Sequence, residues 1–166
     1  MVIYSTSDRD IAFGAEGPSK SHPSTGATIR DLWHGHTNWL AGGTHRAYFD
    51  PGYCCNSTGN RSFINPNNSW DQYTFTRRDD PGNSSVDRSI GRLNGVEELN
   101  GAIDNAIVLQ ITNYPMGIGG VIDNSSGTSS KRNTNNRFSE FIMYNSGKED
   151  SFVEQIEENQ MIYWNL

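Results

Sequence analysis

Trp70-Asp71-Gln72-Tyr73-Thr74-Phe75-Thr76 is the stretch that decides the fold class of this chain. It is rich in aromatic and β-branched residues, and its apolar and polar residues alternate as the two faces of a β-strand require. The run ends at Asp79-Asp80-Pro81-Gly82, where proline fixes φ and glycine permits a positive φ in a tight turn. These residues predict a strand with one buried face that ends in a turn.

The sequence on either side of this strand predicts further strands separated by polar turns. Val86–Leu93 ends at Asn94-Gly95, a dipeptide typical of a two-residue hairpin turn. Ala106–Thr112 is apolar and β-branched, as a buried strand would be. Shorter strands are predicted at Asp10–Gly14, within Arg30–Tyr53 on either side of Gly42-Gly43, at Met116–Ile122 and at Phe138–Tyr144. Polar loops are predicted at 17–24, 54–69 and 123–136.

After Gly147 the apolar spacing changes to that of a helix. The residues at this spacing are Phe152, Val153, Ile156, Gln160 and Tyr163, and we expect Asp150 or Ser151 to cap the first turn. The glutamates fall elsewhere on the helical wheel and predict a solvated face: Glu149, Glu154, Glu157 and Glu158. The chain is therefore predicted to be all-β, a β-sandwich with one short C-terminal helix packed against its side or end.

Length and composition support this fold class and argue against others. The 166 residues suit a single domain, and Asn, Ser and Gly, which favour turns, make up roughly a third of them. The net charge is −6 and no basic run exceeds Arg77-Arg78, so nucleic-acid binding is not expected. No apolar stretch approaches the ~18 residues of a membrane span, and no signal peptide is recognised. The adjacent Cys54 and Cys55 are expected to stay reduced.

The C-terminal third resembles a known family. Residues 137–145 read Arg-Phe-Ser-Glu-Phe-Ile-Met-Tyr-Asn, and a helix with Ile156-Glu157 follows them. Together they resemble the closing segment of concanavalin A-like domains of the laminin-G type. Trp70–Arg78 and Asn38–Gly42, the latter preceded by Leu32–Gly35, are similar to strand motifs of the same group. The resemblance covers residues 30–165 in the family's order and implies a two-sheet jelly-roll β-sandwich.

The beginning of the chain departs from the family. Family members have more strand material before the Asn38–Gly42 motif than this chain supplies. The chain is predicted to be a single domain spanning 1–166, of which residues 1–30 are the less certain part. They form an arm that contacts a partner, or a partner chain completes the sheet beside them. An open sheet edge of that kind invites strand addition.

Catalysis is not expected from these residues. Glycoside hydrolases of this fold carry paired carboxylates on one strand, in a pattern like Glu-x-Asp-x-x-Glu, and the sequence has no such pattern. It also lacks a Gly-x-Ser-x-Gly motif. We therefore expect a protein that is not an enzyme, with a glycoside hydrolase-like activity as the least favoured alternative.

The sequence offers candidate ligands for two kinds of metal site, zinc and calcium. His34 and His36 would point the same way on a strand, and a hairpin would bring His45 near them, which is the minimum for an open zinc site. Calcium is the favoured ion, because laminin-G-type domains often bind one at a loop rim. Its candidate ligands lie in turn-rich regions: Asp79, Asp80 and Asp123, with Asp104 as a further candidate. No other cofactor is expected.

A glycan site is the favoured ligand site. Sugars stack on aromatic rings and are oriented by amide, carboxylate and imidazole groups, and the segment Trp33–Tyr53 has this mixture. The candidate residues are Trp33, His34, His36, Asn38, His45 and Tyr53. Trp39 and Tyr48, from the same segment, are expected in the core, where aromatic side chains mostly belong.

The sequence thus predicts a non-catalytic recognition and attachment module on the surface of a larger assembly. A lectin-like domain without a secretion signal suits a virion decoration or fibre protein, particularly of a bacteriophage. The alternative is a purely structural decoration or cement protein without a sugar site. The expected partners are other structural proteins of the assembly, a cell-surface glycan, and further copies of the chain.

Overall fold

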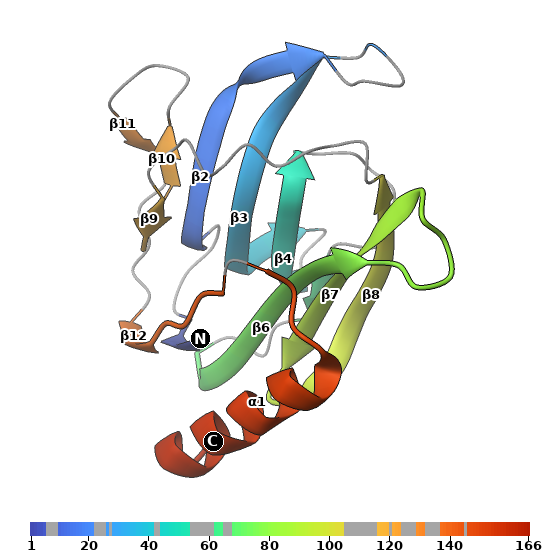
Figure 1. The fold of residues 1–166 in the computed structure, drawn as a ribbon. Coiled ribbons are helices and arrows are strands. Elements are labelled where there is room, and N and C mark those ends of the chain that lie inside the picture. Colours follow the sequence, from blue (N-terminus) through green and yellow to red (C-terminus); the bar gives the residue numbers. More distant parts are fainter. Residues whose placement is uncertain are drawn as a thin grey trace.

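A computed structural model places twelve strands and one helix among the residues that it describes (Figure 1). These residues are 1–5, 10–21, 26, 28–41, 44–53, 62–64, 68–104, 116–119, 121–123, 129–131, 137–144 and 146–166. The strands form two sheets, and helix α1 (Asp150–Trp164) comes last. The predicted all-β class with one C-terminal helix is confirmed. Within these ranges, no helix is both long and apolar enough to cross a membrane.

The first sheet has five strands in the order β12-β1-β6-β7-β8, and every neighbouring pair is antiparallel. Two of the predicted turns connect its strands, one between β6 and β7 and one between β7 and β8. Asp80 Oδ1 accepts a hydrogen bond from Gly82 N at 2.8 Å, and Asn94 and Gly95 have φ values of 49° and 78°, as a primed hairpin turn requires. The strands are β1 (Val2–Tyr4), β6 (Trp70–Asp79), β7 (Val86–Leu93), β8 (Val96–Asp104) and β12 (Arg137–Glu140).

The second sheet has seven strands, with β11-β10-β2-β3-β4-β5 in order and β9 beside β2. Its pairs are antiparallel except for β10 and β2, which are parallel. The strands are β2 (Asp10–Ser21), β3 (Thr28–Ala41), β4 (Thr44–Tyr53), β5 (Ser62–Ile64), β9 (Gly117–Ile118), β10 (Val121–Asp123) and β11 (Ser129–Lys131). The predicted break at residues 42–43 separates β3 from β4.

Strand β2 continues through a segment that the sequence predicts to be a loop. Its register with β3 shifts between Glu16 and Ser19, so Pro18 lies at an irregularity of the ladder. On its other side, β2 pairs with β9 and β10 only as far as Glu16. Proline has no N–H to donate and is tolerated at such edges and bulges. The loop prediction is therefore wrong for residues 17–21, and residues 22–25 lie outside the described part.

Several other boundaries differ from the predictions because pairing partners decide them. Strand β5 lies within the predicted loop 54–69 and pairs with β4, and β11 lies within the predicted loop 123–136 and pairs with β10. The predicted strand Met116–Ile122 is divided between β9 and β10. The predicted strand Phe138–Tyr144 ends at Glu140, because its partner β1 begins at Val2, which pairs with Glu140. Ala106–Thr112 and the two cysteines lie outside the described residues.

Aromatic rings from both sheets form the core. Phe49 of β4 stacks on Phe75 of β6 with ring centroids 5.2 Å apart, and Phe13 of β2 lies 6.1 Å from Phe75. Gly35 of β3 is required here, because a Cβ at this position would collide with the ring of Phe13. Tyr73 and Phe75 therefore mark the face of β6 that is turned toward the second sheet.

Helix α1 covers the opposite face of the five-stranded sheet. Gln72 and Arg78, on that face of β6, hydrogen-bond to Gln160 and Asp150 of the helix. Figure 1 shows α1 running past the lower ends of β6, β7 and β8. Two predictions about its sequence are wrong. The N-cap is Glu149 with no side-chain cap bond, because the Asp150 carboxylate binds Arg78 instead. Glu157 is buried, whereas Tyr163 is 77% exposed.

Candidate functional site

A cavity of about 590 Å³ lies between β6, the segment 141–148 and α1. Its walls are mainly apolar and include Phe13, Phe75, Met116, Phe141, Phe152 and Ile156. Cavities of this size and character are typical of ligand-binding sites, which fall between ~300 and ~1,000 Å³. The exposed side chains of Ile142, Met143 and Tyr144 also line it, so they border its mouth.

The cavity exists because the two edges of β6 are not equally paired. On one edge β6 pairs with β7 from Tyr73 to Asp79. On the other edge, β1 covers only Trp70 to Gln72, and Met1 adds two hydrogen bonds to the main chain of Tyr73 at 2.8 and 2.9 Å. Beyond Tyr73 no strand among the described residues pairs with this edge. The cavity is lined by Thr74, Phe75 and Thr76, which follow directly.

The segment 141–148 passes this open edge without pairing with it as a strand. It approaches β6 closely at Gly147, where a Cβ would lie only 2.7 Å from the carbonyl oxygen of Arg77. Glycine is required at this approach because any side chain would collide with the main chain of β6. The segment therefore closes the Arg77 end of the cavity and leaves Phe75 facing into it.

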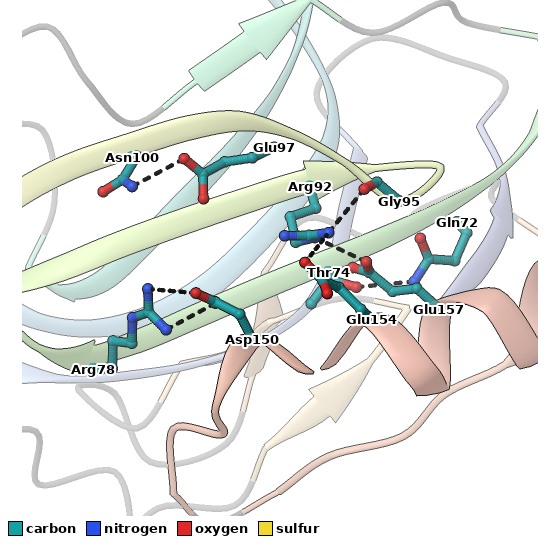
Figure 2. A network of polar contacts seen from close by, with 10 residues as sticks. All are labelled: Gln72, Thr74, Arg78, Arg92, Gly95, Glu97, Asn100, Asp150, Glu154 and Glu157. Carbon is teal, nitrogen blue, oxygen red and sulfur yellow. Dashed lines mark hydrogen bonds and ion pairs between the residues drawn. The ribbon is translucent and has the colours of Figure 1, made fainter. Parts of the chain in front are cut away.

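Polar groups of α1 line the cavity on the helix side. Glu157 Oε2 accepts a hydrogen bond from Arg92 Nε at 2.8 Å, and Gln160 Oε1 accepts one from Gln72 Nε2 at 3.2 Å. Figure 2 shows Glu157 beside Arg92, which also donates to the carbonyl of Gly95. The second polar atoms of the two helix residues, Glu157 Oε1 and Gln160 Nε2, have no hydrogen-bond partner among the described residues. Both atoms are buried with almost no accessible surface, so they lie behind the cavity wall.

Charged residues of the cavity wall are mostly engaged by one another. Arg77 pairs with Asp87, and Arg78 binds both oxygens of Asp150 at 2.8 and 3.0 Å. Lys148 lies 5.2 Å from the centre of the Tyr144 ring and donates to Ser146 Oγ. The cavity therefore offers mainly apolar surface rather than a cluster of one charge.

The amino group of Met1 is also part of this wall and is perturbed by its position. It donates to the carbonyl of Tyr73 while buried beneath the cavity. Burial disfavours the charged ammonium and lowers its pKa from 8.0 to about 6, although the carboxylates of Glu140 and Glu157 oppose this shift. The protonation state of this group therefore changes near neutral pH.

The residues predicted to bind a glycan lie along the β3–β4 hairpin, in strands rather than loops. Tyr53 pairs with Asp31 at one end, and His45 pairs with Leu40 at the other. Tyr53 lies eight positions after His45 in β4, which is roughly 27 Å of extended strand, so one monosaccharide cannot contact both. His36 is 2% exposed, which contradicts the expectation of an accessible loop residue. The side chains of the other glycan candidates lie outside the described part: Trp33, His34, Asn38, His45 and Tyr53. The same is true of Trp39 and Tyr48, which are predicted to be in the core.

The residues predicted to bind calcium are not brought together. Asp79 ends β6, and Asp80 lies in the following turn, where it binds Gly82 N and pairs with Arg88 at 3.4 Å. Asp123 belongs to β10 of the other sheet, on the opposite side of Figure 1, and Asp104 ends β8. The part of the chain that the structure describes holds no group of three or more His, Cys, Asp or Glu side chains suited to a metal. The zinc prediction falls outside this part, because the side chains of His34 and His45 are not described.

The sequence carried a partial signal for the cavity residues that it did not identify. Val153, Ile156 and Gln160 follow helical spacing, and Glu157 lies one turn after Val153, within the same stripe. A charged residue inside an apolar stripe indicates a buried ion pair. Its partner, Arg92, could not be recognised, because it lies on a strand 65 residues earlier.

Comparison of the chain with family models, curated proteins and solved structures finds no match. The resemblance to concanavalin A-like domains therefore stays a prediction.

Proposed function

We propose that this protein is a non-catalytic recognition and attachment module, built as a concanavalin A-like jelly-roll sandwich, that holds a partner in the cavity beside β6. The observation that carries the proposal is the apolar cavity of about 590 Å³ at an edge of β6 that none of the described strands pairs with beyond Tyr73. The arrangement of two sheets with aromatic rings between them supports the sandwich.

The chemistry of the cavity favours binding over catalysis. Asp87 and Glu157 both line it. Arg77 pairs with Asp87 and Arg92 pairs with Glu157, and both arginines belong to the five-stranded sheet. Carboxylates neutralised in this way serve as structural counter-ions, whereas a glycosidase pair must be free to donate and accept a proton. Aromatic and methionine side chains around them provide contact area for a partner.

The glycan site and the virion surface remain predictions of the sequence. The described contacts support a partner site at β6 more directly, because the walls of that cavity come from residues whose side chains the structure places. Binding of the purified chain to a glycan array, with and without a calcium chelator, tests the sugar prediction separately.

The proposal is tested with the neutral fluorophore Nile red as a probe of the cavity. We expect saturable binding to the folded chain, and loss of most of it in Val153→Trp, because Val153 lines the cavity and a tryptophan would fill it. Gln155→Trp, on the exposed side of α1, is the matched control and should bind like the unchanged chain. Near-ultraviolet circular dichroism establishes that each variant is folded. Equal binding by the two variants, or no saturable binding at all, would overturn the proposal.

A further inference from the structure

We infer that the occupant of this cavity is an extended segment of a partner polypeptide, which adds to the open edge of β6 as a further strand. The inference rests on the proposed function and names the partner that the cavity takes. Its basis is the match between what β6 leaves unpaired and what a β-strand supplies.

The hydrogen-bonding directions along β6 can be read from its neighbours. The carbonyl of Gln72 accepts from Asn94 N at 2.9 Å, on the β7 side of the strand. Directions alternate along an antiparallel strand, so Thr74 and Thr76 also bond toward β7, and the odd-numbered residues bond away from it. Tyr73 confirms the alternation, because both of its outward hydrogen bonds go to Met1. The next outward-facing main chain is that of Phe75.

Phe75 therefore presents one donor and one acceptor to the cavity. No hydrogen bond from the described residues to its N–H or C=O is found on this edge. A main-chain amide of an added strand supplies the complementary acceptor and donor, which is the basis of β-augmentation. Such a strand continues the line that Met1 and β1 begin on the same edge, so its spacing from β6 is already set.

The two sides of the cavity then define the side chains of the incoming strand. Side chains that point toward the second sheet meet Phe13, Met116 and Phe141. Those that point the other way meet Phe152, Val153 and Ile156 of the helix region. Successive residues of a strand alternate between these two sides, so the incoming segment carries apolar residues in succession, as strands buried on both faces do.

Apolar side chains of the helix form this wall, so β-branched residues, which favour strands, suit the positions that face it. Open edges are usually protected by proline or by a bulge, as at Pro18 of β2, and the Tyr73–Asp79 run of β6 contains no proline.

The test uses the full chain and a panel of blocked heptapeptides of the form Ac-Lys-Val-Thr-x-Thr-Val-Lys-amide, where x is Val, Ile, Leu, Phe or Thr. We expect at least one apolar member to bind saturably, and hydrogen exchange at the Phe75 amide to slow at least tenfold when it is bound. The same peptide with alternate amides N-methylated keeps its side chains but loses its donors on one edge, and should bind at least tenfold more weakly. Val153→Trp should abolish binding, and Gln155→Trp should not.

The outcomes separate this inference from the proposed function. If Nile red binds and no peptide of the panel does, the cavity takes a small apolar ligand and the strand inference is wrong. Equal binding of the N-methylated peptide, or no change in exchange at Phe75, also overturns it. If sedimentation shows that the chain is a dimer in which the Phe75 amide is already protected, a second copy occupies the edge and the partner is misassigned.

Discussion

Among the described ion pairs that join α1 to the five-stranded sheet, two have the same shortest distance in very different surroundings. Arg92 Nε lies 2.8 Å from Glu157 Oε2, with side chains 10% and 2% exposed. Arg78 Nη1 lies 2.8 Å from Asp150 Oδ1, with side chains 27% and 49% exposed. Figure 2 shows both pairs on the same face of the sheet. The comparison teaches that burial, and not distance, sets what each pair contributes to stability.

Removing the buried carboxylate should have the largest effect. We expect Glu157→Ala to lower the free energy of unfolding by about 3–5 kcal/mol, because it leaves Arg92 charged and buried without its close partner. Urea denaturation measures the change. Glu158→Ala, an exposed neighbour on the same helix, is the control and should change stability by less than about 0.5 kcal/mol. A loss in Glu157→Ala no larger than in this control would contradict the comparison.

The double variant Arg92→Met, Glu157→Leu sharpens the same point. Replacing both members by apolar residues removes the unpaired charge, so much of the lost stability should return.

The amino group of Met1 should give the next largest effect. In a preparation whose first residue is Met1, the pKa is about 6 when folded and 8.0 when unfolded. The unfolded state then binds more protons between pH 6 and pH 8, so stability rises with pH through this window. Full development of the shift amounts to about 2–3 kcal/mol. The difference between unfolding curves of the free and N-acetylated chains isolates this group from the histidines.

This pH dependence also distinguishes the two ion pairs. Glu157 raises the pKa of the folded Met1 amino group, so Glu157→Gln should extend the lower limit of the window to lower pH and leave its upper limit in place. Asp150→Asn should leave the window in place. A window that moves equally in both variants would show that the two pairs act alike on Met1.

The turn beside Arg92 should contribute an intermediate amount. Gly95 has φ 78°, where a Cβ costs about 1–2 kcal/mol, and its carbonyl accepts from Arg92 Nη2 at 2.8 Å. We expect Gly95→Ala to lower the free energy of unfolding by that amount in urea denaturation. Gly82→Ala, in the other hairpin turn and without a positive φ, is the matched control and should be nearly neutral. An equal loss in both variants would rule out backbone strain as the cause.

The exposed ion pair should have the smallest effect. Asp150→Asn removes the partner of Arg78 and one favourable charge from the first turn of α1, which together contribute about 0.5–1 kcal/mol. Thermal unfolding at low and high salt measures this, and the difference should shrink as salt screens it. A loss as large as that of Glu157→Ala would mean that burial does not separate the pairs.

Local patterns sufficed to predict the elements that they themselves encode. Alternation in Trp70–Thr76, the Asn94-Gly95 turn and the helical spacing after Gly147 correspond to β6, the β7–β8 turn and α1. Strand β8 was not predicted, because Glu97, Glu98 and Asn100 have little strand preference and pairing with β7 alone holds them extended.

Local sequence patterns could not predict the candidate site, because the site depends on which part of β6 has no neighbouring strand among the described residues. Nothing within the β6 sequence says that β1 will cover it only as far as Gln72, or that Gly147 will approach its far end. The burial of Glu157 likewise follows from Arg92, far away in the chain. The sites predicted at His36 and Asp80 rest on composition, which does not reveal that His36 is buried or that Asp80 accepts a hydrogen bond within its own turn.

The position of β1 has a consequence for the order of folding. This strand lies between β6 and β12, so Val2 pairs with both Gln72 and Glu140. At ~5–20 residues per second, a ribosome needs roughly 7–30 s to pass from the first of these residues to the last. Contacts so distant in sequence also form slowly during refolding. Strand β1 therefore gains its neighbour β12 only after residues 137–140 have been synthesised, long after β6 is available to pair with it.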